Sequence, residues 1–161
     1  MTGILESLSR IGTRASSSAI GGMLYHVVCR RIDTLLIPIS KGRLSMGPPG
    51  QTVLITTFGA KSGKLRKASL AFMWRGDSMV IIASKGGASR HPAWYHNLRA
   101  DPRLVVQYRG AIEDRVAREA VGEEREKLFE TMSSIFSNFA AYQARATNRK
   151  IPVMVLERVK V

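Results

Sequence analysis

The sequence predicts an α+β protein built on an antiparallel β-barrel. Short β-rich runs are separated by hairpin turns. The alternation of strand and helix expected of a Rossmann sheet does not occur. A chain of 161 residues with 45% hydrophobic content is long enough for one buried core. The formal charge is +13, and the segment 58–109 holds ten cations and two anions, which attracts a polyanionic ligand, an anionic lipid surface or nucleic acid.

We expect residues 1–46 to form an amphipathic helix and a linker ahead of the barrel domain at 47–161. Apolar residues recur at steps of three and four from Ile4 to about Ile39. Such a basic helix packs on its own domain or a partner subunit, or lies on an anionic membrane. The lone Cys29 and the lack of a secretory signal indicate a cytoplasmic protein, with contact to the inner face of the cell membrane as an open alternative.

The rest of the chain alternates strands with two helices. Strands are expected where β-branched and aromatic residues cluster between turn residues, at 52–57, 67–74, 79–83, 104–108, 112–120 and 151–159. A short helix over 91–100 has Pro92 near its first turn. A longer helix over 122–146 starts with acidic residues, as the helix dipole prefers.

A glycine-bracketed turn between the first two strands carries four cations. Gly59 and Gly63 allow positive backbone angles, so we expect successive backbone N–H groups to point into one concavity. Lys61, Ser62 and Arg66 surround that concavity. The turn therefore predicts a phosphate site, and the alternative is an ordinary solvated hairpin turn.

A second glycine-rich turn, Ser84-Lys85-Gly86-Gly87, follows the third strand. At a barrel mouth it would offer backbone N–H groups and a cation to another part of the same ligand. Trp94 and Tyr95 come shortly afterwards and either flank a planar ring or pack in the core.

Four short motifs occur in a recognisable order: Thr56-Thr57-x-Gly59-x-Lys61-Ser62-Gly63-x-x-Arg66, Ala83-Ser84-Lys85-Gly86-Gly87, Pro92-x-Trp94-Tyr95-x-Asn97-Leu98 and Asp101-Pro102. In this order and spacing, the chain from about 36 to 159 resembles the deazaflavin-dependent nitroreductase family. These are split β-barrel oxidoreductases of actinobacteria that use reduced coenzyme F420. The resemblance implies a split barrel like that of FMN-binding proteins, with a C-terminal helix over the pocket.

The resemblance also implies a function. The protein would transfer hydride from reduced F420 to a quinone, an enone or a nitroaromatic acceptor, and the barrel would form a homodimer or act alone. No metal site is expected. Tyr142, and after it Ser84, are the candidates to donate a proton or hydrogen bond to the acceptor. The residues implied in coenzyme binding are Lys61, Ser62, Gly63, Arg66, Ala83, Ser84, Lys85, Gly86, Gly87, Pro92 and Trp94.

The chain departs from the family pattern at two places. Ala60 stands where the family has Arg, so that one contact to the coenzyme tail is either missing or replaced by Lys64 or Lys67. Ala71, Phe139 and Arg145 replace tyrosines of members that reduce nitroimidazoles, which predicts weak or absent activity on such compounds.

Two other functions are compatible with the sequence. The same fold serves non-catalytic proteins and proteins that bind FMN or haem, because fold does not fix function. The high charge also suggests a nucleic-acid-binding protein, but no helix-turn-helix, zinc-finger or RNA-recognition motif accompanies it, so specific nucleic-acid binding is not expected.

Overall fold

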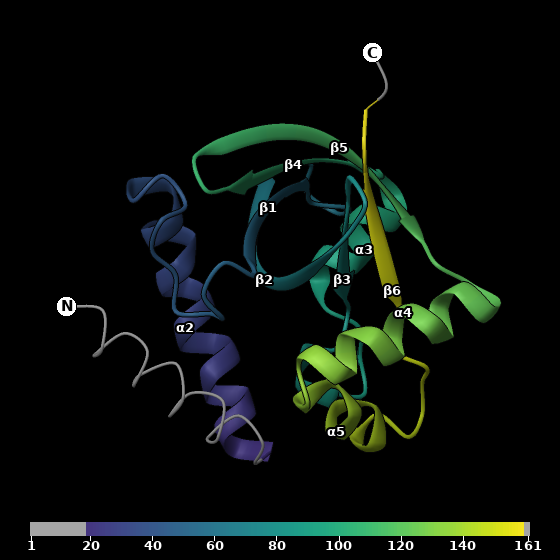
Figure 1. Cartoon of the computed structure of the whole chain (residues 1–161). Helices are drawn as coiled ribbons and strands as arrows, with labels where there is room; N and C mark the ends of the chain where they lie inside the picture. The colour runs from purple at the N-terminus through teal and green to yellow at the C-terminus, as the bar shows by residue number, and fades with distance from the viewer. Residues whose placement is uncertain (1–18, 160–161) are drawn as a thin grey trace.

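The computed structural model describes residues 19–159 and shows a closed barrel of six antiparallel strands with helices on its outside (Figure 1). The strand order around the barrel is β1-β2-β3-β6-β5-β4, and β1 closes the barrel by pairing with β4. The strands are β1 (Thr52–Phe58), β2 (Leu65–Arg75), β3 (Ser78–Ile82), β4 (Arg103–Tyr108), β5 (Ala111–Glu119) and β6 (Val153–Arg158). The predicted barrel is thus confirmed, with each strand boundary within two residues of its expected place.

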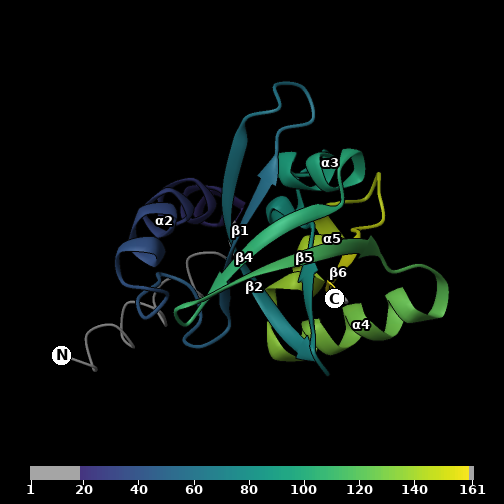
Figure 2. The same ribbon diagram turned by 90° about the horizontal axis from the view of Figure 1, so that it is seen from above.

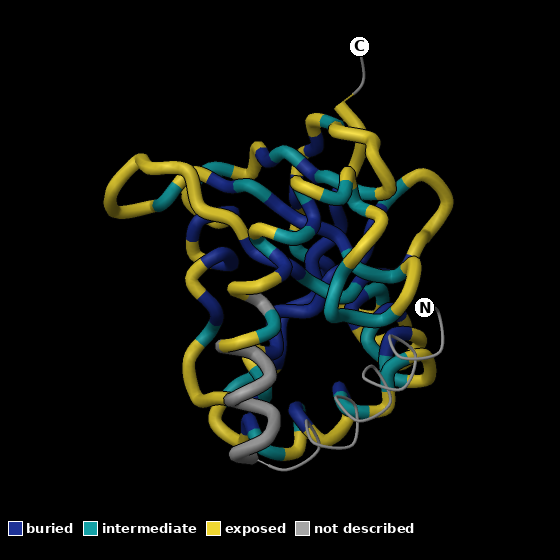
Figure 3. The backbone as a smooth tube through the Cα atoms, turned by 90° about the vertical axis from the view of Figure 1, so that its left-hand side faces the viewer, coloured by how far each residue is buried: buried dark blue, intermediate teal, exposed yellow. Residues whose placement is uncertain are grey.

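Two neighbouring strands, β3 and β6, are buried on both faces. Ile81 and Leu156 point into the barrel interior, which also receives Trp94. Their neighbours Val80 and Val155 point outwards into a second apolar cluster. Because successive side chains of a strand alternate between faces, a strand covered on both sides becomes a continuous apolar run. Figure 3 shows this buried centre, with the exposed residues concentrated in the connecting loops and outer helix faces.

The helices cover two sides of the barrel: α2 (Ala19–Ile39) lies along one side, while α4 (Gly122–Ile135) and α5 (Asn138–Arg145) cover another (Figure 1). The carboxylate of Asp33 on α2 accepts hydrogen bonds from Ser69 Oγ on β2 at 2.9 Å and from the Met46 amide at 2.6 Å. The predicted part of this helix before residue 19 lies outside the described residues. The division at residue 46 stays a prediction.

None of the helices between residues 19 and 159 combines the length and the apolar content that are needed to cross a membrane.

The prediction of one helix over 122–146 is wrong in one respect, because this segment forms two helices, α4 and α5. Phe136 leaves the helical region, with φ −124° and ψ 89°, and α5 starts anew after Ser137. The serines around the break have low helix propensity, and Ser134 Oγ donates to the Thr131 carbonyl inside the last turn of α4. The break lets Phe136 meet Phe139 edge to face, with ring centroids 5.8 Å apart. The second helix can then fold back over the barrel.

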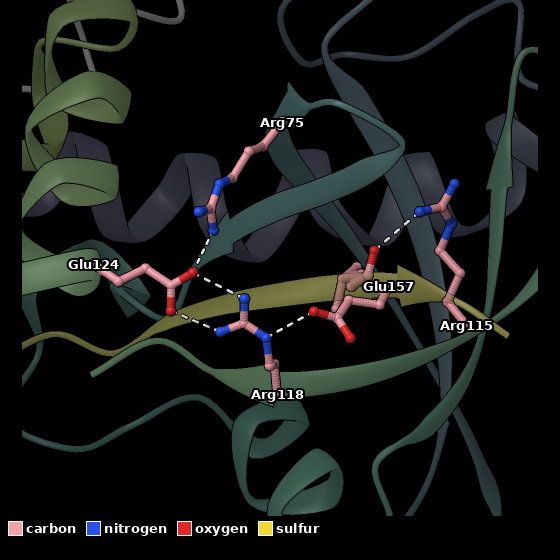
Figure 4. A network of polar contacts seen from close by, with 6 residues as sticks. Arg75, Arg115, Arg118, Glu124 and Glu157 are labelled. Carbon is pink, nitrogen blue, oxygen red and sulfur yellow. Dashed lines mark hydrogen bonds and ion pairs between the residues drawn. The ribbon is translucent and has the colours of Figure 1, made fainter. Parts of the chain in front are cut away.

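An arginine–glutamate network fixes the first turn of α4 to the barrel wall (Figure 4). The guanidinium of Arg118 on β5 donates to both carboxylate oxygens of Glu124, at 2.7 and 2.8 Å, and to Glu157 on β6 at 2.7 Å. Arg75 on β2 also pairs with Glu124. These two guanidinium groups lower the pKa of Glu124 to about 2. The start of α4 is thereby held against three strands.

Candidate functional site

The cationic β1–β2 turn is positioned by a buried asparagine on α3 (Ala93–Ala100). Asn97 Oδ1 accepts a hydrogen bond from the Ala60 amide at 3.0 Å, and Asn97 Nδ2 donates to Thr57 Oγ1 at 3.0 Å. Figure 2 shows the turn extending past the barrel beside α3. Because a buried amide side chain is costly to leave unpaired, Asn97 holds the turn in one place.

The backbone of this turn differs from the expected anion-binding concavity. Gly59 donates to the Lys64 carbonyl, the amides of Ser62 and Gly63 both donate to the Gly59 carbonyl, and the Ala60 amide is taken by Asn97. Gly63 has φ +65°, as expected, whereas Gly59 does not have the positive φ that was expected of it. The N–H groups of Gly59, Ala60, Ser62 and Gly63 are already engaged in these hydrogen bonds. The positive charge of the site therefore comes from side chains rather than from the backbone.

These side chains line a groove of about 870 Å³ between the β1–β2 turn and α3. Four cations contribute to it: Lys61, Arg66, Lys67 and Lys85. Its lining contains no carboxylate, and among the described residues none of the four cations forms an ion pair. Arg75, Arg118 and Arg158 on the strands β2, β5 and β6, by contrast, are paired with glutamates. Unpaired cations around one groove attract a ligand with several negative charges.

The Ser84-Lys85-Gly86-Gly87 turn contains the short 3₁₀ helix η1 (Lys85–Gly87) and lies between this groove and α5. Lys85, Gly86 and Gly87 have φ of 48°, 64° and 80°. Such angles are natural for glycine and strained for lysine. A Cβ on Gly87 would come within 2.7 Å of the Tyr142 carbonyl, so only glycine lets α5 approach so closely.

A second cavity of about 420 Å³ lies beyond the turn and is mainly apolar. Its walls come from α2, β2, the turn and the break between α4 and α5, with Ala71, Trp94, Phe136, Phe139 and Tyr142 among the lining residues. Asp33 and Lys85 supply its charged groups. Burial raises the pKa of Asp33, although the hydrogen bonds from Met46 and Ser69 oppose the shift. The cavity suits a flat organic molecule with few polar groups.

Tyr142 is placed in this apolar cavity by α5. Its side chain is 1% exposed, and its hydroxyl oxygen accepts a hydrogen bond from Asn138 Nδ2 at 3.1 Å. The guanidinium of Arg145 lies 5.0 Å from the centre of its ring. Ser84 also lines the cavity and is 5% exposed. Both candidate proton donors, Tyr142 and Ser84, are therefore residues of the cavity wall.

The groove and the cavity meet, because Lys85 and Trp94 line both. Together they can hold a molecule with a planar, mainly apolar end and a long anionic tail. A deazaflavin that carries a phosphodiester and glutamates has this shape and charge, so the residues present fit the expected coenzyme.

The predicted site residues are largely brought together. Those that line the groove are Lys61, Ser62, Arg66, Lys85, Pro92 and Trp94, and those that line the cavity are Ser84, Lys85, Trp94 and Tyr142. The other four, Gly63, Ala83, Gly86 and Gly87, are not among the lining residues and shape the two turns instead. Ala83 is fully buried, and its amide donates to the Pro152 carbonyl.

Sequence reasoning missed several residues of the site. Of the two lysines offered in place of an arginine at position 60, Lys67 lines the groove and Lys64 does not, so Lys67 was named but not chosen. Asp33 and Phe136 line the cavity, and Asn97 positions the cationic turn. One available signal was Asp33, a lone acidic residue within an apolar helical stripe; Asn97 stood in a quoted motif without an assigned role.

Comparisons with known proteins place the chain in a family. The family model of the F420H2-dependent quinone reductases matches residues 31–158. An F420H2-dependent quinone reductase of Mycobacterium tuberculosis is 36% identical over 125 residues, which are 74% of this chain and 83% of that protein.

Solved structures show the same likeness. One of an F420-H2 dependent reductase has a TM-score of 0.61 and 42% identity, covering 66% of this chain and 94% of that one. Another, described as a domain-swapped dimer, has a TM-score of 0.64 and 35% identity over 79% of this chain and 94% of that one. The haem storage protein HutZ of Vibrio cholerae shares the fold alone. Its identity is 12% and its TM-score 0.52, covering 70% of this chain and 84% of that one. The chain therefore belongs to the F420H2-dependent quinone reductase family.

Proposed function

We propose that this protein is an F420H2-dependent reductase that passes hydride from the reduced coenzyme to a quinone. The observation that carries the proposal is the junction, at Lys85 and Trp94, of an apolar cavity with a groove whose four cations form no ion pair within residues 19–159. The groove matches the anionic tail of the coenzyme, and the cavity matches its ring together with a flat acceptor. Family membership supports both parts.

The residues of the groove would hold the coenzyme by charge. Lys61, Arg66 and Lys67 would contact the phosphate and glutamates, while Lys85 would reach the tail where it enters the cavity. Trp94 is buried at the junction and offers a rigid flat wall beside the ring. When bound, the reduced deazaflavin supplies a hydride.

The chain itself would orient the acceptor and exclude water. The apolar walls formed by Ala71, Phe136 and Phe139 favour a neutral ring over a hydrated ion. Tyr142 and Ser84 would donate hydrogen bonds to the acceptor oxygen. The hydrogen bond from Asn138 orients the Tyr142 phenol.

The direct test is equilibrium binding of glutamylated deazaflavin and of FMN, followed by turnover with a quinone and a nitroimidazole. We expect the deazaflavin to bind more tightly, and binding to weaken with salt and in the double variant Lys61→Gln/Lys85→Gln. Quinone reduction should exceed nitroimidazole reduction. Tyr142→Phe should keep coenzyme affinity and lower kcat. A preference for FMN, or equal binding by the double variant, would contradict the proposal.

An exposed apolar stripe on α2 supports a contact with a membrane or with a second subunit. On α2, Val28, Ile32, Leu35 and Ile39 are 42–82% exposed and follow one another at four-, three- and four-residue steps. We propose that this stripe makes a peripheral contact with an anionic membrane, where a quinone is held. A homodimer is the other use of such a surface. Sedimentation equilibrium distinguishes a dimer from a monomer.

A further inference from the structure

One arginine outside the two cavities makes an unusual set of contacts with the glycine-rich turn. Arg149 lies in the loop between α5 and β6, and its guanidinium donates to three backbone carbonyls: Ser84 at 2.8 Å, Ala88 at 3.0 Å and Ala83 at 3.3 Å. The same group lies 2.9 Å from His91 Nδ1. All four acceptors belong to the segment 83–91.

The loop that carries Arg149 is itself held in place. Gln143 Nε2 donates to the Arg149 carbonyl at 3.0 Å, and Asn148 Nδ2 donates to the Ser89 carbonyl at 3.1 Å. Gln143 Oε1 accepts from the Ile151 amide and from Arg125. The guanidinium is therefore presented from a fixed frame, which is how a positioning residue acts on a neighbouring segment.

The turn needs such support, because three successive residues from Lys85 to Gly87 have positive φ. Strained backbone persists only where the surroundings define it strongly. We propose that Arg149 is the positioning residue that holds the Ser84-Lys85-Gly86-Gly87 turn and the following Ala88 in the coenzyme-binding conformation. The neutral ring of His91 completes this set of contacts, which we call the clamp. The inference rests on the proposed function of the turn.

The neutral state of His91 follows from its surroundings. A guanidinium only donates, so Nδ1 must accept, and a protonated ring could not. Burial lowers the pKa of His91, and the charges of Arg149 and His96 lower it further, against an opposing effect of Glu119. The His91 ring also packs on the ring of Tyr95. The Tyr95 hydroxyl donates a hydrogen bond to Glu119, and Glu119 forms an ion pair with Arg99.

The pH dependence of coenzyme affinity has a definite sign. Above the ordinary histidine pKa of about 6.5 the clamp is complete. As the pH falls through the lowered pKa of His91, the ring becomes charged beside Arg149 and the clamp weakens. His96, which lines the groove, is the same in all the proteins compared below and does not affect their comparison.

The first test measures amide hydrogen exchange of the segment 83–91 in the protein without coenzyme. Arg149→Met should speed this exchange, and Arg149→Lys should restore it only partly, because a lysine cannot reach all four acceptors. Arg158→Met removes an equal charge far from the turn, where Arg158 pairs with Glu113, and should leave the exchange unchanged. Equal exchange in Arg149→Met and the wild type would overturn the proposal.

The second test measures the affinity for oxidised glutamylated deazaflavin at about pH 7.5 and about pH 5.5. Arg149→Met should bind roughly tenfold or more weakly at the higher pH. His91→Asn keeps an acceptor without a titrating ring, so it should match the wild type at the higher pH and exceed it at the lower. Comparing proteins at each pH cancels the titration of the ligand. If lowering the pH reduces the coenzyme affinity of His91→Asn as much as that of the wild type, the role of His91 is contradicted.

The two tests also separate this inference from the proposed function. A wild-type protein that binds no deazaflavin would refute the function. The exchange experiment uses no ligand and would still decide whether Arg149 holds the turn.

Discussion

At the scale of single residues, Lys67 and Lys64 are a natural pair for measuring the groove. Both are exposed lysines near the β1–β2 turn, but only Lys67 lines the groove. Lys67→Gln should therefore weaken coenzyme binding by roughly three- to tenfold at low salt, since a charge-assisted contact is lost. Lys64→Gln removes the same charge from the molecule and should change the dissociation constant less than about twofold. Titration of both variants at two salt concentrations checks the assignment, and equal losses would mean that only net charge matters.

Residues such as Asn97 show where sequence reasoning stops. The cations of the two turns could be predicted because charge and glycine are visible in the sequence. The role of Asn97 could not, because its partner Ala60 lies 37 positions away and is brought near only when α3 packs beside the β1–β2 turn. The same holds for Arg149, whose acceptors at 83–91 are about 60 positions away. A side chain that acts on distant backbone leaves no local pattern.

At the scale of elements, strands were easier to predict than helix ends. The strands have alternating or continuous apolar runs bounded by turns, and their boundaries followed from that pattern. The break between α4 and α5 could not be predicted in this way. Leu128, Met132 and Phe136 continue a helical spacing, and no proline or glycine interrupts it. The break brings Phe136 against Phe139, and this contact between residues on either side of it cannot be read from the helical spacing.

The attachment of α4 to the barrel should make stability depend on acid. Glu124 has a pKa of about 2 because Arg118 and Arg75 donate to its carboxylate. A lowered carboxylate pKa contributes stability that is fully present above the unfolded value of about 4.3 and is lost as the pH falls towards 2. The partly exposed network should contribute about 1 kcal/mol. Glu124→Gln should therefore lower the free energy of unfolding at neutral pH by about that amount, and by less near pH 3.

Urea unfolding at the two pH values measures this effect. Glu130→Gln is the matched control, because Glu130 is exposed on the same helix and forms no ion pair among the residues 19–159. If both variants lose the same stability at neutral pH, the network does not hold α4.

At the scale of the whole molecule, the order of strands explains why the site forms where it does. Pairing of β3 with β6 inside the barrel brings the loop before β6, with Arg149, against the turn after β3. The basic groove lies at the β1–β2 turn, and the apolar cavity lies between α2, β2 and α5. The sequence predicted an antiparallel barrel, but it could not show which strands are neighbours, since β3 and β6 are separated by some 70 residues.

The outer face of α2 allows a last prediction, on membrane contact of the whole chain. Leu35 is 68% and Ile39 82% exposed, and both lie outside the cavity wall that Asp33 and Cys29 form. If this stripe enters a membrane surface, the wild-type protein should sediment with anionic vesicles, and Leu35→Glu/Ile39→Glu should bind at least about tenfold more weakly, because burial of each side chain contributes roughly 1.5–3 kcal/mol. Ile112→Glu changes an equally exposed residue on β5 and should sediment as the wild type does. Equal sedimentation of all three proteins, abolished by salt, would show that net charge alone draws the protein to the vesicle and that the α2 stripe takes no part.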